Sequence, residues 1–394
     1  MTILVTGATG NLGRLVIDSL LERGADPQSI VAGARDVTRA EDLGVRVARL
    51  DYTDPSSVTA ALEGVDSVLL ISGSEVGQRV AQHEAVIDAA KAAGVSKFGY
   101  TSAPRATTSD LVLAPEHKAT EELIVGAGLP SVILRNNWYT ENYAADVASA
   151  AETGVLASGA GDGRVASASR KDFAEAAAVV LLEDGHIGQV YELGGDVAWG
   201  YADLAGAIAE VTGRDVEYQP LTPDEQLAGL QEAGLDEGTA GFVVALDAGI
   251  AAGALADTDG TLARLIGRPT TPLVDGLRVL TRSVRRCLSR MDVRDREHGS
   301  DGSQPVFRED LPDGRADVSE QIEGAGRVLD AERRLDLSPL TDHAHSHERF
   351  VDRADADRHG AHSDEVRDQR TRSVDTAHAG RRTHRRLYPL GESR

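Results

Sequence analysis

Residues 2–13 read TILVTGATGNLG, a run of aliphatic and β-branched residues that passes through three glycines into an amphipathic segment. A strand, a glycine turn and a helix in this order are typical of the first crossover of a dinucleotide-binding fold. Gly7 permits the tight turn, Gly10 lets the backbone approach a diphosphate, and Gly13 lets the helix pack closely on the strand. The diphosphate is expected at the helix N-terminus, where unpaired N–H groups favour negative charge. A tight turn without a ligand is the alternative.

Short apolar runs alternate with helical segments up to about residue 200. The pattern predicts strands over 29–34, 46–50, 68–71, 97–101 and 131–134, and helices over 56–62, 79–93 and 115–127. Near-continuous apolar strands separated by helices indicate an α/β fold, a Rossmann-type doubly wound parallel sheet covered on both faces. Helices over 173–182, 201–212 and 223–233 and strands over 190–193 and 216–219 predict a smaller substrate-side portion over the sheet edge.

The composition changes near residue 281. Residues 281–394 contain 22 Arg, no Lys and 23 Asp plus Glu, so nearly all of the net charge of −22 belongs to residues 1–280. We expect one reductase domain over 1–280, mainly dinucleotide-binding over 1–150 and mainly substrate-side over 151–280. The polar segment 281–394 is expected to be a disordered tail, because it offers too little apolar surface to offset the entropy of ordering. Its many arginines without lysine are typical of GC-rich DNA translated in a shifted frame.

Charge and cysteine content exclude several classes of function. The acidic surface of residues 1–280 opposes binding to nucleic acid and to anionic membranes. The sequence has no leader-like start and no apolar run of about 18 residues, so a cytoplasmic protein is expected. The lone cysteine, Cys287, lies in the tail and leaves the folded part without a disulfide, a cysteine-ligated metal or a thiol nucleophile. No metal site is expected.

Four longer motifs carry a resemblance to a known family. They are GATGNLG at 7–13, LISGSEVGQR at 70–79, LRNNWYTENY at 134–143 and GDGRVASASR at 161–170. Over about residues 1–280 the chain resembles the NmrA-like, atypical short-chain dehydrogenase family and, within it, the bacterial NAD(P)H:quinone oxidoreductases of type 2. The resemblance implies a reductase that passes a hydride from NADPH directly to a quinone, with no flavin. One departure is Asn137, where the family usually has glycine.

The resemblance also implies where the cofactor lies. Its contacts come from the glycine turn and from segments that follow several strands. These residues are Gly7, Ala8, Thr9, Gly10, Asn11, Leu12, Arg35, Asp51, Ser72, Gly73, Ser74, Asn136, Asn137, Trp138, Tyr139, Thr140, Glu141 and Ala168. Asn136 and Tyr139 are the expected catalytic residues, in a segment that shapes the nicotinamide and quinone pocket. Core packing is the alternative for Trp138 and Tyr139.

The residues after the second strand bear on cofactor choice. Arg35 is the first charged residue there, where a guanidinium suits the 2′-phosphate of NADPH and a carboxylate suits the ribose hydroxyl of NADH. We therefore expect NADPH to be preferred and NADH to bind more weakly. Asp36 either opposes the phosphate or caps the following helix. Asp51 resembles an aspartate that lies near the adenine amine, with an ordinary loop aspartate as the alternative.

One motif is missing. Ordinary short-chain dehydrogenases and epimerases move a proton with Tyr-x-x-x-Lys, and none of the four lysines has a tyrosine four residues before it. Alcohol oxidation and epimerisation are therefore not expected, whereas a reduced quinone can collect its proton from water. His117 and Lys118 are the nearest acid–base candidates, and a surface role is expected for both. The alternative function is a NADP-binding redox sensor without turnover. A homodimer is the candidate assembly.

Overall fold

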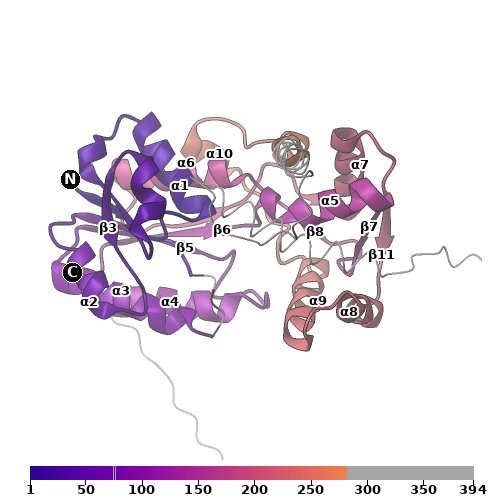
Figure 1. Cartoon of the computed structure of the whole chain (residues 1–394), viewed down its shortest axis with the longest axis horizontal. Coiled ribbons are helices and arrows are strands. Elements are labelled where there is room, and N and C mark those ends of the chain that lie inside the picture. Colours follow the sequence, from indigo (N-terminus) through magenta and orange to yellow (C-terminus); the bar gives the residue numbers. More distant parts are fainter. Residues whose placement is uncertain (74, 76, 282–394) are drawn as a thin grey trace, which may run out of the picture. The chain divides into compact units, whose positions relative to one another are not determined.

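The computed structural model describes residues 1–73, 75 and 77–281. A sheet of seven parallel strands runs in the order β3-β2-β1-β4-β5-β6-β9 (Figure 1). The strands are β1 Ile3–Val5, β2 Ile30–Ala34, β3 Arg46–Arg49, β4 Ser67–Leu70, β5 Lys97–Ser102, β6 Ser131–Asn136 and β9 Val190–Leu193. Strand order reverses between β1 and β4, as in a Rossmann fold, where ligands bind beyond the carboxyl ends of the strands. The expected fold class is confirmed.

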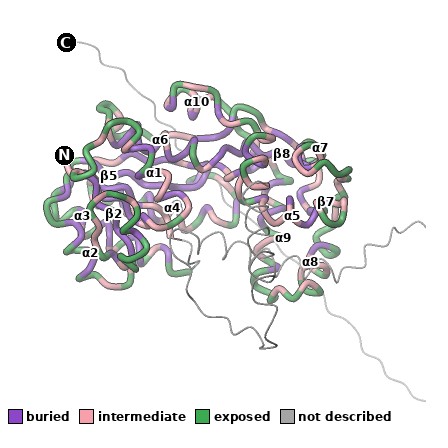
Figure 2. Tube along the Cα trace, turned by 45° about the horizontal axis from the view of Figure 1, so that its top comes forward, coloured by how far each residue is buried: buried purple, intermediate pink, exposed green. Residues whose placement is uncertain are grey.

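Helices cover both faces of this sheet (Figure 1). One face carries α1 Asn11–Glu22, α6 Arg170–Leu182 and α10 Thr261–Ile266, and the other carries α2 Pro55–Ala61, α3 Arg79–Ala93 and α4 Ala114–Ala127. We call the core on the α1, α6 and α10 side of the sheet the first core cluster, and the core on the α2, α3 and α4 side the second. Within β1, Ile3 and Val5 pack into the first core cluster and Leu4 packs into the second. Whereas the edge strands β3 and β9 are partly exposed, the inner strands β1, β2, β4 and β5 are buried along their whole length (Figure 2). This two-sided burial explains their continuous apolar sequences.

A smaller portion forms a third core cluster around Tyr143, Trp199 and Tyr201. Its helices are α5 Ala144–Thr153, α7 Tyr201–Thr212, α8 Pro223–Glu232 and α9 Glu237–Ala251. Its strands are β7 Val155–Ser158 with β11 Glu217–Pro220, which are parallel, and β8 Arg164–Val165 with β10 Trp199–Gly200, which are antiparallel. Short 3₁₀ turns are η1 Pro27–Ser29, η2 Val37–Leu43 and η3 Thr140–Tyr143.

Local signals for helix ends are confirmed. Asp54 caps α2 by accepting hydrogen bonds from Ser56 N and Ser57 N, and Pro55 occupies the first helical position. The helices α3 and α4 end at Gly94 and Gly128, which have φ values of 69° and 71°. Glycine adopts this left-handed conformation without the steric penalty of a side chain.

Other expectations need correction. Strand β9 was assigned from sequence to the smaller portion, yet it pairs with β6 in the main sheet. The sequence analysis also did not anticipate α5, α9, α10, β7, β8 or β10. Of the expected tail only Thr281 is described, so the expectation of disorder, like Cys287 and Ser74, lies outside the described residues. Within the described part of the chain, no helix has the length and apolar character needed to cross a membrane.

Candidate nucleotide-binding site

The glycine turn forms a tight connection between β1 and α1. Gly7 has a φ of 57°, and its carbonyl accepts a hydrogen bond from Gly10 N at 3.0 Å. A Cβ on Gly13 would lie 2.3 Å from Gly7 O and 2.8 Å from Ala8 Cα, so only glycine fits there. Gly10 precedes the helix and offers no side chain to cap it. The first N–H groups of α1, including those of Asn11 and Leu12, are therefore available to an anion.

The turn is held in place from the sheet. Ala8 is buried, and its N–H donates to Gly33 O at 3.0 Å. Leu12 is buried in the first core cluster, which leaves its backbone as the part able to face a ligand. Thr9 and Asn11 are half-buried at the turn. These four residues and the glycines lie where the sequence analysis expected the diphosphate.

The segment after β2 presents a largely exposed guanidinium. The Arg35 side chain is 75% exposed, and its only ion pair among the described residues is a long one, 3.6 Å from Nη1 to Glu75 Oε1. The Asp36 carboxylate accepts hydrogen bonds from the N–H and the hydroxyl of Thr38, and it thereby caps η2. The hydrogen bond from the Thr38 hydroxyl is the main cause that lowers the Asp36 pKa. Of the two interpretations left open for Asp36, the structure supports the cap.

Two residues after β3 have different roles. Asp51 Oδ1 accepts hydrogen bonds from Thr53 N at 3.0 Å and from the Thr53 hydroxyl at 2.8 Å, and these bonds lower its pKa. Tyr52 donates from its hydroxyl toward Thr6 Oγ1 at 2.6 Å and Ile71 O at 2.9 Å. Tyr52 thereby links the carboxyl ends of β1 and β4. The sequence analysis did not anticipate this bracing role.

The segment after β4 is held by side chains from neighbouring elements. Ser72 N donates to Thr101 Oγ1 of β5 at 2.9 Å, and Gly73 N donates to His83 Nε2 of α3 at 3.0 Å. Ser72 and Gly73 lie at the sheet edge that the sequence analysis expected to line the cofactor. Ser74, the third residue expected there, lies outside the described residues.

Asn136 and Tyr139 lie together after β6. Asn136 Nδ2 is 3.4 Å from the Tyr139 hydroxyl, while Asn136 Oδ1 is buried and has no hydrogen-bond partner among the described residues. The Tyr139 ring packs edge-on against Phe173, and the Arg170 guanidinium carbon lies 4.9 Å from its centroid. Burial raises the pKa of the Tyr139 phenol, which keeps it protonated near neutral pH. Leaving a buried amide oxygen without a hydrogen-bond donor costs about 1–3 kcal/mol.

The other residues of the segment 136–141 form hydrogen bonds or pack within the fold. Asn137 Nδ2 donates to Leu255 O at 3.2 Å, and its Oδ1 accepts from Trp138 N at 2.7 Å. Trp138 is half-buried against the third core cluster. Thr140 N donates to Ala168 O at 2.9 Å, and Ala168 forms a parallel bridge with Tyr139. Glu141 accepts from Arg170 N, and burial raises its pKa.

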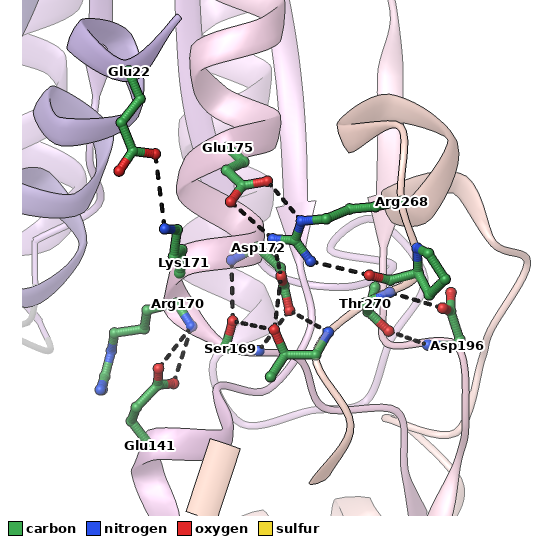
Figure 3. A network of polar contacts seen from close by, with 12 residues as sticks. Glu22, Glu141, Ser169, Arg170, Lys171, Asp172, Glu175, Asp196, Arg268 and Thr270 are labelled. Atoms are coloured by element: carbon green, nitrogen blue, oxygen red, sulfur yellow. Dashed lines mark hydrogen bonds and ion pairs between the residues drawn. The ribbon is translucent and has the colours of Figure 1, made fainter. Parts of the chain in front are cut away.

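A polar network surrounds Ser169 and Asp172 at the start of α6 (Figure 3). Asp172 is fully buried at the start of α6, and its carboxylate accepts from Arg268 Nη2 at 2.7 Å and Thr271 N at 2.9 Å. Ser169 and Asp172 also cap the helix reciprocally. The segment 268–271 thereby ties the start of α6, next to Ala168, into the fold. Sequence reasoning missed this network, since its hydrogen-bonded members are up to 102 residues apart.

His117 is not on the surface, so that expectation was wrong. It is buried, and its Nδ1 lies 2.8 Å from the Tyr100 hydroxyl. Burial lowers the pKa of His117 to about 3, so the imidazole is neutral. Lys118 is exposed and lies 4.0 Å from Glu122, as expected for a surface residue.

A cavity of about 360 Å³ lies beyond the carboxyl ends of β5, β6 and β9. Its lining is Pro104, Arg105, Asn137, Glu192, Leu193, Gly194, Ala254, Asp257, Thr258 and Asp259. The lining carries three carboxylates and one guanidinium, and this net negative charge disfavours the binding of anionic ligands. Asn137 is among the lining residues, at the position where the resembling family usually has glycine.

Comparisons with known proteins agree with this geometry. The NAD(P)H-binding family matches residues 7–184. Quinone oxidoreductase 2 of Escherichia coli (strain K12) is 47% identical over 278 residues, which are 70% of this chain and 97% of the relative. The crystal structure of the NADPH-dependent quinone oxidoreductase of Escherichia coli with NADPH has 46% identity and a TM-score of 0.68, covering 71% of this chain and 100% of that chain. Citrobacter sp. triphenylmethane reductase complexed with NADP(H) has 37% identity and a TM-score of 0.67, with coverage of 71% and 100%.

A doubly wound sheet with a glycine turn that can receive a diphosphate defines the class of NAD(P)H-binding α/β proteins. The chain belongs to the NmrA-like family of NAD(P)H-binding oxidoreductases. The family resemblance drawn from the sequence motifs is confirmed.

Proposed function

We propose that this protein is an NADPH-dependent oxidoreductase that reduces quinones to hydroquinones by direct hydride transfer, without flavin or metal. One observation carries the proposal: the amide of Asn136 and the neutral phenol of Tyr139 lie together beyond β6. Tyr139 packs against the core cluster that contains Ala8 of the glycine turn. The glycine turn and the Asn136–Tyr139 pair therefore lie on the same side of the sheet. The identity of 47% to a quinone oxidoreductase over almost its whole length supports the same activity.

The residues present suit the expected cofactor. The close approach at Gly13 and the uncapped start of α1 leave a cradle of N–H groups for the diphosphate. Arg35 offers an exposed guanidinium for the 2′-phosphate, which supports a preference for NADPH over NADH. The unpaired Asn136 Oδ1 suits a ligand N–H or O–H.

The chemistry divides between cofactor and chain. When bound, NADPH supplies the hydride. The Tyr139 phenol stays protonated and can donate a hydrogen bond to a quinone oxygen, which stabilises the negative charge that develops there. Asn136 restrains the Tyr139 hydroxyl, and Phe173 restrains its ring. The product oxygen then collects its proton from water, so no Tyr-x-x-x-Lys pair is required.

The proposal extends to the setting of the reaction. We place the enzyme in the cytoplasm, without nucleic-acid or membrane partners, and a homodimer is the candidate assembly. The net charge of −22 supports the exclusion of anionic partners. We also propose residues 1–280 as one reductase domain.

Turnover tests the proposed activity directly. Purified protein with NADPH should oxidise the reduced nicotinamide when para-benzoquinone is added, with no flavin or metal supplied. Secondary alcohols with NADP⁺ should give no reduction, because the proton-transfer pair is absent. Absorbance of the reduced nicotinamide follows both reactions. If NADPH binds saturably but benzoquinone causes no oxidation, the protein is the redox sensor and the enzyme assignment fails.

Arg35 provides the test of cofactor choice. Arg35→Ala should weaken NADPH by roughly ten- to a hundred-fold, about 1.5–3 kcal/mol, because charge-assisted hydrogen bonds to the 2′-phosphate are lost. NADH, which lacks this phosphate, should bind almost as before. Titration calorimetry with both cofactors measures the two affinities.

Two control variants accompany this test. Arg23→Ala removes the same charge at the end of α1 and should leave both affinities unchanged. Glu75→Gln removes the ion-pair partner of Arg35 and should not weaken NADPH. An equal loss for NADPH and NADH in Arg35→Ala would show that Arg35 only shapes its loop.

A further inference from the structure

Three buried or half-buried side chains hold the backbone that follows β4. His83 Nε2 accepts from Gly73 N at 3.0 Å, and Arg79 Nε donates to Gly73 O at 2.7 Å. Glu116 of α4 accepts from Gly77 N at 2.8 Å. We call Arg79, His83 and Glu116 the loop clamp. The N–H and the carbonyl oxygen of Gly73 are thus both hydrogen-bonded to side chains of α3.

The clamp is internally connected. Arg79 Nη1 donates to Glu116 Oε2 at 2.7 Å, so the residues that bind Gly73 O and Gly77 N are themselves an ion pair. His83 Nδ1 lies 3.0 Å from the Thr120 hydroxyl, which donates onward to Glu116 O at 2.9 Å. Because Thr120 uses its proton there, it accepts from His83 Nδ1–H, and His83 Nε2 is left as an acceptor. Both hydrogen bonds of the His83 ring are therefore consistent with the neutral tautomer that carries its proton on Nδ1.

Burial makes this arrangement rigid. His83 is fully buried and Arg79 is 5% exposed. Burial lowers the pKa of His83 to about 3, so the imidazole remains neutral and its Nε2 keeps its lone pair for Gly73. A buried ion pair adds little net stability over a well-packed apolar pair, but it strongly disfavours any conformation that separates its partners. The Arg79–Glu116 pair thus favours one placement of Gly73 O and Gly77 N.

The clamped backbone lies at the edge that the cofactor is proposed to occupy. Ser72 N is bound by Thr101 of β5, directly before Gly73. Ile71 N donates to Thr6 Oγ1 at 3.0 Å, and Thr6 immediately precedes the glycine turn. Gly73 is therefore connected through two neighbouring backbone positions to the turn proposed for the diphosphate.

We propose that the loop clamp positions the Ser72–Gly73 backbone for the nicotinamide half of NADPH, and so controls hydride transfer more than adenine-side binding. The inference rests on the proposed function for the identity of the ligand. His83, Arg79 and Glu116 act through the Gly73 and Gly77 backbone, so they are positioning residues. None of them is among the cofactor-binding or catalytic residues expected from the sequence, although Arg79 ends the motif at 70–79.

Variants of His83 separate positioning from general stability. His83→Leu removes the acceptor for Gly73 N, while His83→Gln can keep an acceptor near the Nε2 position. His117→Leu is the matched control, since His117 is also a buried neutral imidazole but bonds Tyr100 instead of the loop. For each protein we would measure the Kd of NADPH, the Kd of 2′,5′-ADP, and the single-turnover rate with benzoquinone.

The expected pattern is specific. His83→Leu should weaken NADPH and slow hydride transfer by about tenfold or more, because small displacements at a reacting centre have large kinetic effects. Binding of 2′,5′-ADP, which lacks the nicotinamide, should change less than about twofold. His83→Gln should recover most of both losses. His117→Leu should leave the Kd values and the single-turnover rate near those of the unmodified protein.

Other results would overturn the inference. The clamp has no positioning role if His83→Leu keeps the NADPH affinity and the transfer rate, or if it weakens NADPH and 2′,5′-ADP equally. The same holds if His117→Leu reproduces the losses. Failure of the proposed function looks different: the unmodified protein would then bind NADPH without oxidising it in the presence of quinone. The comparison of the two Kd values would still test the clamp.

Discussion

Replacing Gly13 with alanine should abolish measurable cofactor binding. The added Cβ would lie 2.3 Å from Gly7 O and 2.8 Å from Ala8 Cα, and both are backbone atoms that no side-chain rotation can clear. The helix α1 must then move away from the turn, which misplaces the N–H groups proposed to hold the diphosphate. We expect NADPH affinity to fall by more than about a hundred-fold and the free energy of unfolding to fall by about 1–3 kcal/mol. Calorimetric titration and urea unfolding measure the two effects.

Gly206→Ala is the matched control for this substitution. Gly206 is exposed within α7, and a Cβ there would meet nothing within 4 Å. Because alanine favours a helix over glycine by roughly 0.5–1 kcal/mol, this variant should be as stable as the unmodified protein or slightly more stable. Cofactor binding should not change. If Gly13→Ala binds NADPH normally, the close approach at the turn is not needed for the site.

Replacing Asp172 with alanine should have the largest effect on stability. The carboxylate is fully buried and accepts hydrogen bonds from Arg268, Thr271 and Ser169. Removing it leaves the N–H groups of Thr271 and Ser169 without an acceptor, whereas Arg268 keeps its ion pair with Glu175. We expect the free energy of unfolding to fall by about 2–4 kcal/mol, as measured by urea unfolding. Quinone reduction should also weaken, because Ala168, next to this network, pairs with Tyr139.

Glu225→Ala tests whether the helix cap alone explains that loss. Glu225 occupies the same third position of a capping box in α8, where it bonds Thr222, but it is exposed. Its replacement should have a much smaller effect, because water can satisfy the groups that it leaves. Similar losses for Asp172→Ala and Glu225→Ala would show that the contacts to the segment 268–271 contribute nothing.

Much of the fold follows from local sequence. The strand, turn and helix over residues 2–13 depend on neighbours within a few positions, and β1 and α1 form there. The ends of α3 and α4 depend on single glycines with positive φ. Strand β9 was harder to place, because its pairing with β6 depends on a segment far away in the chain.

Some parts of the candidate site likewise follow from local sequence, and others depend on the tertiary structure. The glycine turn and the segment 136–141 were selected from motifs, and the structure places Ala8 and Tyr139 against one core cluster. A surface role was expected for His117, but its side chain faces Tyr100 inside the fold. A helical residue's neighbours in sequence point in other directions, so they do not report its burial.

The amino-acid sequence by itself determined the class of fold and the place of the glycine turn, and it led to the proposals that this turn holds a diphosphate and that Arg35 favours NADPH. These features rest on backbone sterics and helix-end chemistry, which act between residues close in the chain. Only the tertiary structure decided that Asp36 caps a turn, that His83 holds Gly73, and that Asp172 binds Arg268, 96 residues away. Such contacts depend on which faces of distant helices and strands meet in the packed core, and no local pattern specifies that geometry.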